Sequence, residues 1–187
     1  GRVALGADRG RSRKLDGAGM SEAQAVSVLL EDRLITLNRA VGLIRRRNLP
    51  VRSLAIGPTA TPGLSRLTIM MHSDSATAER AVQHLQKMIG VRGAIAFPSL
   101  DGVARELALI KVRAPHDRYA ELLDVVQLYN AVVIDDATDG LIVQLSGTEA
   151  FVLSGIRALE RFDVIEVARS GTIALGTANN LQSETVT

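Results

Sequence analysis

The sequence contains no cysteine and no tryptophan, and these absences already exclude several kinds of site. Without cysteine the chain can form no disulfide, no thiolate nucleophile and no cysteine-ligated zinc or iron–sulfur centre. Aromatic residues make up only 3% of the 187 residues, so a folded core has to be built from Val, Leu, Ile and Ala. The content of 47% hydrophobic and 22% charged residues is typical of a globular protein rather than a disordered one.

Several functional signatures are missing as well. The sequence has neither GxGxxG nor GxxxxGK[ST], and no serine lies in a GxSxG motif. The three histidines fall in different predicted elements without metal-ligand spacing, and the turn with Asp135, Asp136 and Asp139 lacks the arrangement of a calcium-binding loop. No apolar run approaches the roughly 20 residues that cross a membrane. We therefore expect no catalytic residue, no metal site and no membrane span in this chain.

The first nineteen residues differ from the rest of the chain. They contain five basic residues, two acidic residues and five glycines, without any periodicity. They also lack the apolar core of a secretory signal. We expect a disordered N-terminal tail at residues 1–22 and a second disordered tail at residues 177–187.

Between residues 26 and 44, apolar residues first follow the spacing of a strand and then the spacing of a helix. Alternating apolar residues predict a half-buried strand: Val26, Val28 and Leu30. Apolar residues at helical spacing predict a helix directly after it: Leu34, Leu37, Val41 and Ile44. The first turn of such a helix exposes backbone N–H groups, where a carboxylate or phosphate can dock. The alternative is that the turn is only a connector, with Asp32 capping its own helix.

The remaining patterns continue this alternation of strands and helices. Strands are predicted at residues 51–56, 64–72 and 91–97. A helix lies before the last of them, with one of Ser73, Asp74 and Ser75 as its N-cap and Gly90 as its C-terminal cap. Its predicted inner residues are Ala78, Val82, Leu85 and Ile89. The order is β-α-β-β-α-β.

The second half of the chain repeats this order. Strands are predicted at residues 106–111, 132–134, 141–145 and 164–169, with a possible extension at 173–175. One helix opens at Asp117 and another is capped by Thr148. The fold class is therefore α+β, with two ferredoxin-like βαββαβ domains in tandem. Each domain is small and leaves one sheet face open, so we expect a homodimer.

RNA-recognition domains share this strand order, but they stack bases on aromatic residues of their central strands. Residues 26–30 and 64–72 contain no Phe, Tyr or Trp. The basic run Arg45–Arg47 and the basic tail could contact phosphate, although basic residues at a helix C-terminus also complement the helix dipole. We expect no nucleic-acid partner. A regulatory or binding function is the class that remains.

Three stretches resemble the small, regulatory subunit of acetolactate synthase (acetohydroxyacid synthase). They are SLAIGPTATPGLSRLTI at residues 53–69, RELALIKV at 105–112 and EVARSG at 166–171. The resemblance implies an ACT domain at residues 23–98 and a C-terminal ferredoxin-like domain of the small subunit at 102–176. The N-terminal nineteen residues lie outside it.

The resemblance also implies a function. Such subunits carry no catalytic residues, dimerise, and bind and activate a large catalytic subunit that uses thiamine diphosphate, Mg²⁺ and FAD. The complex acts in the cytoplasm in the biosynthesis of valine, leucine and isoleucine, and a branched-chain amino acid, usually valine, inhibits it. A free-standing ACT-type amino-acid sensor without an enzyme partner is the alternative.

The family binds its effector at the strand-to-helix turn, which usually reads E-N-x-P/S-G-x-L. The corresponding effector-binding residues of this chain are Glu31, Asp32, Leu34, Ile35 and Thr36. Asp32 replaces a neutral amide, and Ile35 replaces a glycine that lets the ligand approach the backbone. Pro50 replaces a second family Asn and removes a backbone N–H. We therefore expect valine control to be weak or altered.

The loop at residues 57–63 is the candidate contact with the catalytic subunit, because it is long, fixed by Pro and Gly, and well matched to the family. Its candidate residues are Gly57, Pro58, Thr59, Pro62 and Gly63. The alternative is a tightly folded hairpin loop without a partner.

Overall fold

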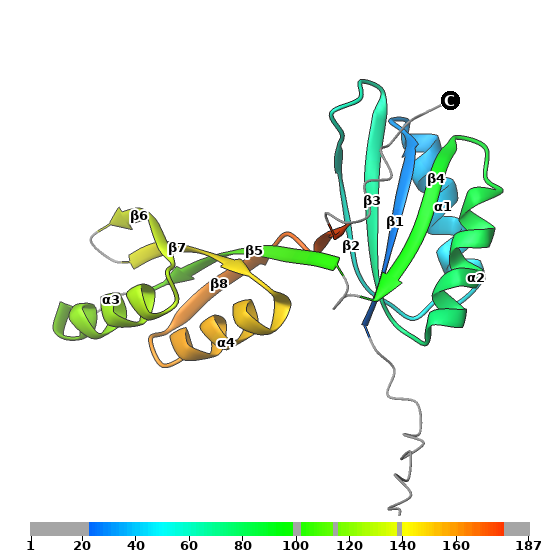
Figure 1. Cartoon of the computed structure of the whole chain (residues 1–187). Coiled ribbons are helices and arrows are strands. Elements are labelled where there is room, and N and C mark those ends of the chain that lie inside the picture. Colours follow the sequence, from blue (N-terminus) through cyan, green and yellow to red (C-terminus); the bar gives the residue numbers. More distant parts are fainter. Residues whose placement is uncertain (1–22, 99–101, 114–115, 138–139, 178–187) are drawn as a thin grey trace, which may run out of the picture.

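A computed structural model describes residues 23–98, 102–113, 116–137 and 140–177. Within these residues, two antiparallel sheets each carry two helices on one face (Figure 1). We call residues 23–98 the first unit and residues 102–177 the second unit. The tails predicted at 1–22 and 177–187 lie outside the described residues, apart from Thr177.

The first unit follows the predicted order β-α-β-β-α-β. Its elements are β1 (Ala23–Glu31), α1 (Leu34–Arg46), β2 (Val51–Pro58), β3 (Leu64–His72), α2 (Ser75–Gln86) and β4 (Val91–Pro98). The strand order β2-β3-β1-β4 places β1 and β3 in the middle. Val26 lies opposite Ile69 in this pair, so both side chains point to the face that the helices cover. The core of the unit lies between this face and the two helices.

Only part of the predicted apolar stripe of α1 faces the sheet. Leu34 is 82% exposed and Val41 is also exposed, whereas Ile44 is buried and Leu37 packs against the core. The buried side of α1 also contains Thr36, Ala40 and Leu43. The helix is therefore turned so that the start of the predicted stripe lies at the surface.

Helix α2 begins as predicted but ends earlier. Asp74 is its N-cap, and the Asp74 carboxylate accepts a hydrogen bond from the Thr77 N–H at 2.7 Å. The helix ends at Gln86, so Gly90, with φ of +91°, belongs to the connection to β4 and not to the helix cap. The prediction that Ile89 is an inner residue is wrong, because Ile89 lies beyond the helix and is 83% exposed.

The second unit repeats the order and adds one strand. Its elements are β5 (Gly102–Val112), a 3-10 turn (His116–Arg118), α3 (Tyr119–Leu128), β6 (Val132–Ala137), β7 (Gly140–Gly147), α4 (Glu149–Leu159), β8 (Val164–Arg169) and β9 (Ile173–Gly176). The strand order of its main sheet is β6-β7-β5-β8. Thr148 caps α4 as predicted, by accepting from the Phe151 N–H at 3.3 Å. Strand β6 extends to Ala137, so the predicted acidic turn is shorter than expected.

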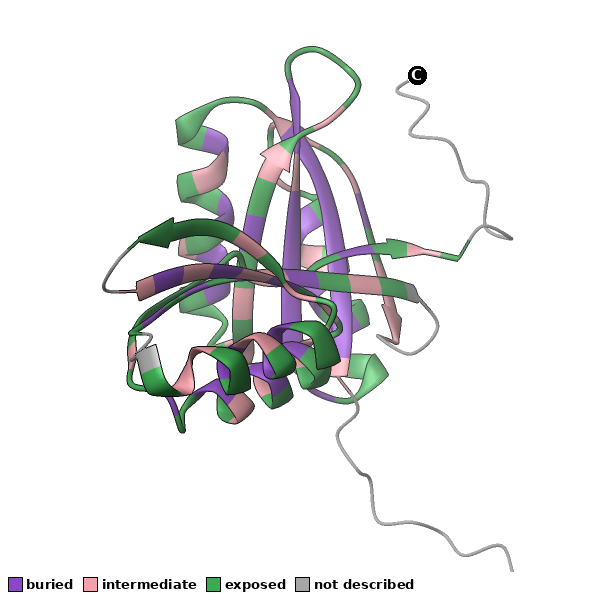
Figure 2. Ribbon diagram, turned by 90° about the vertical axis from the view of Figure 1, so that its left-hand side faces the viewer, coloured by how far each residue is buried: buried purple, intermediate pink, exposed green. Residues whose placement is uncertain are grey.

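Strand β5 takes part in two separate pairings. From Glu106 onward it pairs with β7 and β8, whereas residues 102–105 pair with β9. This β5–β9 ribbon packs on the first unit, on the sheet face opposite the helices, where Ala174 is buried with Ala25 and Met70. Figure 2 shows the ribbon crossing the strands of the first unit, whose middle strands are buried.

The predicted fold class is confirmed: the chain is α+β, with two βαββαβ-like sheets of four antiparallel strands. None of the helices in the described segments is long and apolar enough to span a bilayer.

Candidate functional site

The turn between β1 and α1 is fixed to the β2–β3 hairpin by two hydrogen bonds. The Asp32 N–H donates to the Gly63 carbonyl at 2.8 Å, and the Ser65 hydroxyl donates to the Asp32 carboxylate at 3.0 Å. Helix α1 begins after Arg33 and has no side-chain cap. The alternative interpretation of Asp32 as the helix cap is therefore wrong. Its carboxylate is engaged by β3 instead.

A cavity of about 480 Å³ lies where this turn meets the hairpin. Its lining residues are Leu30, Asp32, Arg33, Leu34, Leu37, Ile56, Gly57, Pro58 and Ser65. Two residue sets that the sequence suggested for different roles, the effector turn and the partner loop, thus share one cavity. Its walls are mostly aliphatic and include the Arg33 guanidinium and the Asp32 carboxylate, the latter already engaged by Ser65, so the cavity suits a small ligand with an apolar side chain.

The other predicted effector residues lie outside the lining of this cavity. Glu31 accepts from the guanidinium of Arg92 at 2.7 Å, on the side of β4. Thr36 is buried against Gly90, where a Cβ on Gly90 would come within 2.8 Å of the Thr36 hydroxyl oxygen. Ile35 lies in a separate hollow on the outer side of α1. Asp32 and Leu34 are thus the two of the five predicted residues that line the cavity.

The outer side of α1 and the edge strand β2 carry exposed aliphatic residues. They are Leu34, Ile35, Val41, Leu54 and Ile56, and we call them the α1–β2 surface. Strand β2 lies at the edge of its sheet, so its outer N–H and C=O groups have no neighbouring strand within the described residues. Apolar residues beside an edge strand are typical of a protein–protein contact.

The β2–β3 loop is both internally bonded and exposed. The Thr59 hydroxyl accepts from the Thr61 N–H at 3.1 Å, and the Thr59 N–H donates to the Leu64 carbonyl at 3.0 Å. Gly63 has φ of +80°, a left-handed conformation that favours glycine. Pro62 and Gly63 remain exposed at the tip. The loop is internally bonded and accessible, and its contact with a partner stays a prediction.

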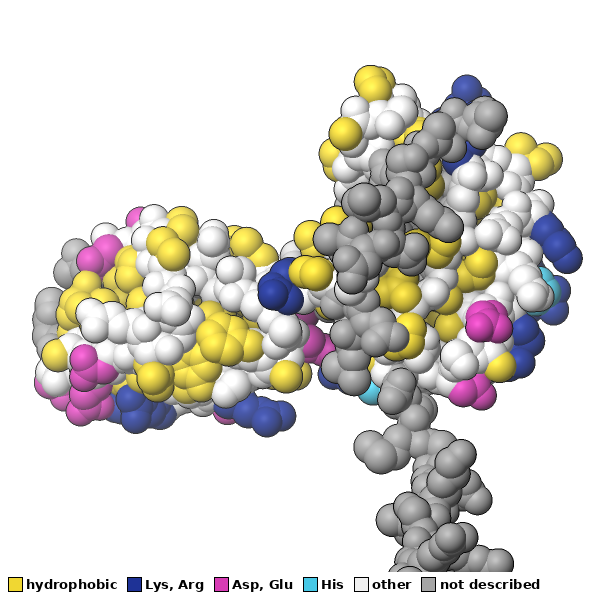
Figure 3. All heavy atoms as spheres, in the orientation of Figure 1, with side chains coloured by type: hydrophobic (Ala, Val, Ile, Leu, Met, Phe, Trp, Pro, Cys, Tyr) yellow, Lys and Arg dark blue, Asp and Glu magenta, His cyan; other side chains and the backbone are white. Residues whose placement is uncertain are grey.

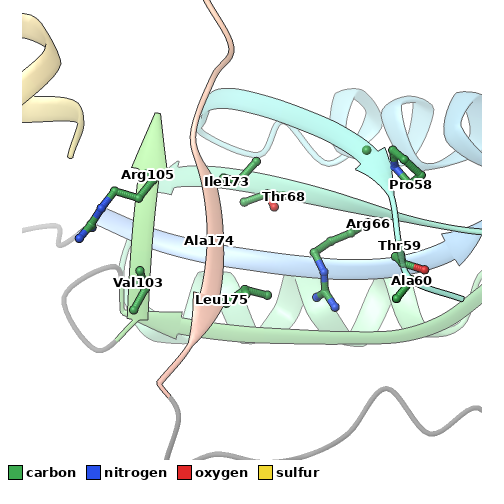
Figure 4. A pocket seen from close by; sticks show the side chains of 11 residues that line it. Pro58, Thr59, Ala60, Arg66, Thr68, Val103, Arg105, Ile173, Ala174 and Leu175 are labelled. Atoms are coloured by element: carbon green, nitrogen blue, oxygen red, sulfur yellow. The ribbon is translucent and has the colours of Figure 1, made fainter. Parts of the chain in front are cut away.

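A second cavity, of about 560 Å³, was not predicted from the sequence. Its lining residues are Gly57, Pro58, Thr59, Ala60, Arg66, Thr68, Val103, Arg105, Ile173, Ala174 and Leu175. Figure 4 shows Arg66 pointing along it, whereas the Arg105 guanidinium points away. Arg66 donates to the Ser27 hydroxyl at 2.5 Å, and burial lowers the pKa of Arg66 below its usual value. Because its walls come from both units, no local sequence pattern could have found this cavity.

One aspartate of the second unit, Asp136, takes part in a structural contact. The Tyr119 hydroxyl donates to the Asp136 carboxylate at 2.8 Å, and this hydrogen bond raises the pKa of Tyr119. Among the residues that the structure describes, no three His, Asp or Glu side chains come together in a way that could hold a metal ion.

Comparison with known proteins identifies the family. The sequence profile "AHAS small subunit-like ACT domain" matches residues 26–93, and "Small subunit of acetolactate synthase" matches residues 105–178. The acetolactate synthase small subunit of Mycolicibacterium smegmatis is 34% identical over 150 residues, which cover 80% of this chain and 88% of that protein. The chain belongs to the acetolactate synthase small-subunit family.

Other members support this assignment. The probable acetolactate synthase small subunit of Archaeoglobus fulgidus is 31% identical over 154 residues, covering 82% of this chain and 96% of that protein. The crystal structure of the acetolactate synthase small subunit from Thermotoga maritima superposes with a TM-score of 0.78 at 31% identity, covering 83% and 97% of the two chains. The predicted family is confirmed, and the first unit is an ACT domain. Members of this family are the regulatory, non-catalytic subunits of acetolactate synthase.

Proposed function

We propose that this chain binds and activates an acetolactate synthase catalytic subunit, and that its ACT domain responds only weakly to valine. The thiamine diphosphate, Mg²⁺ and FAD of the reaction belong to the catalytic partner. Membership of the small-subunit family supports the proposal that the partner is a catalytic subunit. The observation that carries the weak response is the Asp32–Ser65 hydrogen bond inside the turn cavity.

Asp32 disfavours an amino-acid ligand for an electrostatic reason. Its carboxylate lies in the turn before α1, and the first backbone N–H groups of a helix attract the carboxylate of a ligand. Two carboxylates at one helix start repel each other. Ile35, at the position where the family has glycine, lies outside the lining of this cavity. The weaker binding of valine therefore rests on Asp32.

The α1–β2 surface supports a homodimer. Its five exposed aliphatic residues lie beside an edge strand, and a second copy could bury both the side chains and the open strand edge. The cavity at the turn lies next to this surface, since Leu34 and Ile56 belong to both. A ligand in the cavity would therefore act at the dimer contact.

Reconstitution with the cognate catalytic subunit tests the proposal. The wild-type chain is expected to raise acetolactate formation, with little inhibition by valine. Asp32→Asn restores a neutral amide that still accepts from Ser65, and we expect it to lower the valine concentration for half-inhibition by about tenfold, the effect of roughly 1.4 kcal/mol of removed repulsion. The control is Asp135→Asn, which removes an exposed carboxylate from β6.

Absence of activation at any ratio of the two subunits would overturn the partner assignment. Calorimetric binding of valine without activation would favour the free-standing sensor. If Asp32→Asn and Asp135→Asn respond to valine alike, then Asp32 does not set the sensitivity.

A further inference from the structure

Four charged side chains form a continuous chain across the junction of the two units. Arg52 on β2 contacts Glu149 at the start of α4, with both its Nε and its Nη2 atom 2.8 Å from the Glu149 Oε1 atom. The same Oε1 atom lies 3.6 Å from Nη2 of Arg169 on β8. Arg169 in turn forms a two-pronged contact with Glu106 on β5, one bond of which measures 2.9 Å. Positive and negative charges therefore alternate along these four side chains, from the first unit to the interior of the second.

The inner end of this chain is firmly held. The Glu106 side chain is only 2% exposed and also accepts from the Thr172 hydroxyl at 3.5 Å. Its carboxylate is the main reason that the pKa of Arg169 is raised. Glu106 lies where β5 passes from the β9 ribbon into the main sheet. Arg169 therefore holds Glu149 at a position defined by the second unit.

The outer end is held by the first unit. Arg52 also lies 2.6 Å from the His72 ring nitrogen Nε2, through its Nη1 atom, so its guanidinium is oriented by two partners at once. A planar guanidinium that bonds two groups defines a direction as well as a distance.

Apolar contacts also join the two units. Ala174 packs on Ala25 and Met70, and Gly171 lies so close to β2 that a Cβ there would be 3.3 Å from the Leu54 carbonyl oxygen. Such contacts bury apolar area but favour no particular direction, so they allow one unit to turn on the other. The Arg52–Glu149 ion pair, by contrast, is directional.

We propose that the Arg52–Glu149 pair fixes the orientation of the second unit on the ACT domain. Arg52 is its positioning residue, and the Glu106–Arg169 pair holds Glu149 in place. A catalytic partner that contacts both units would need this orientation; that consequence rests on the proposed function, whereas the orientation itself does not.

The absence of cysteine makes the test direct, because two introduced thiols are the only labelling sites in the full-length chain. Spin labels at Arg39→Cys on α1 and Gln127→Cys on α3, both exposed, report the distance between the units by pulsed electron resonance. The labelled chain is mixed with an excess of unlabelled chain, so that distances within one protomer dominate if the chain is a homodimer. We then expect one principal distance in the otherwise wild-type chain. Arg52→Met removes the pair while keeping an unbranched side chain. It should raise the fraction of molecules outside that distance about two- to fivefold, the range expected for an exposed ion pair.

Arg113→Met is the matched control. It removes the Arg113–Asp163 pair of 3.1 Å, which lies within the second unit, and should leave the distance distribution unchanged. Arg52→Lys keeps the charge but not the planar fork, so we expect an intermediate change. Glu149→Gln should broaden the distribution as Arg52→Met does, and the double variant should be no broader than either single one.

Two results would overturn the proposal. One is an unchanged distribution in Arg52→Met, which would mean that the apolar contacts alone set the orientation. The other is equal broadening in Arg52→Met and Arg113→Met, which would mean that any lost ion pair has the same effect.

Discussion

The central strands β1 and β5 hold equivalent places in the two sheets, but they are buried differently. All residues of β1 from Gln24 to Leu30 are buried, on both faces of the sheet. From Glu106 to Val112, β5 instead alternates between buried and more exposed residues. The two units thus share a strand order, but the central strand is covered on one face of the sheet in the second unit and on both faces in the first. What differs is the β5–β9 ribbon, which covers part of the open face of the first unit.

The open face of the second unit keeps exposed aliphatic residues, such as Leu109 on β5. Figure 3 shows hydrophobic side chains at the surface of both units. No element within the described residues covers this face of the second sheet. The second unit thus covers part of the first with a strand, β9, that lies outside the repeated fold.

The helix starts offer a second comparison. In both units the first helix begins without a side-chain cap, after Arg33 and Arg118 respectively, whereas the second helix is capped. Asp74 caps α2 and Thr148 caps α4. The two caps differ in chemistry, because a carboxylate can lose its charge on acidification, whereas the Thr148 hydroxyl carries none.

The largest expected effect comes from a charge placed under the ribbon. Ala174→Asp introduces a carboxylate at a buried contact with Ala25 and Met70 and should lower the free energy of unfolding by about 3 kcal/mol. Ala168→Asp places the same charge on the exposed β8 and should change it by about 0.5 kcal/mol or less. Urea denaturation followed by circular dichroism measures both. Equal losses would show that the ribbon is not a core contact of the first unit.

Removing the cap of one helix, or adding a cap to another, should have a smaller effect. Thr148→Ala removes the oxygen that accepts from Phe151 N–H and should cost about 1 kcal/mol, or roughly 3 °C in melting temperature. Arg33→Ser supplies a cap that α1 lacks and should raise the melting temperature by a similar or smaller amount. Thermal unfolding checks both variants. A lower melting temperature for Arg33→Ser would mean that the turn before α1 has no geometry for a cap.

The smallest expected effect is the pH dependence of the Asp74 cap. Hydrogen bonds from Thr77, its side chain first and its N–H second, hold the pKa of Asp74 below its usual value. The folded state thus favours the ionised carboxylate, and this stabilisation is present above the ordinary carboxyl pKa and lost as the pH falls through the folded value. Asp74→Asn keeps an acceptor without charge. The stability gap between wild type and variant should shrink on acidification, whereas the gap for Thr148→Ala should not. If the stability difference between wild type and Asp74→Asn does not change with pH, the ionised Asp74 carboxylate does not stabilise the helix start.

Local patterns in the sequence were sufficient for the order of elements and for single caps. Alternation predicted Leu64–His72 with the bounds that the structure has, and the extension at 173–175 is β9. The Thr148 cap is equally local, because the N–H from which it accepts lies only three residues away, at Phe151. Such features depend on neighbours along the chain, which a sequence displays directly.

Other features depend on residues far apart in the sequence. Helical spacing indicated an apolar stripe on α1, but only the packing on the sheet showed that Ile44 of this stripe is buried while Leu34 and Val41 are exposed. Of the candidate site, the sequence located the turn and the hairpin loop separately. It did not show that Ser65 binds Asp32 or that both segments line one cavity.

By itself the sequence determined the two βαββαβ repeats and the family, since both follow from local periodicity and short motifs. The tertiary structure decided which surfaces are used: Leu34 and Val41 of α1 face outward, β9 covers part of the ACT sheet, and Arg52 meets Glu149 across 97 residues of chain. The physical reason is that burial and ion pairing depend on distances in space. Those distances exist only once the two sheets are packed together.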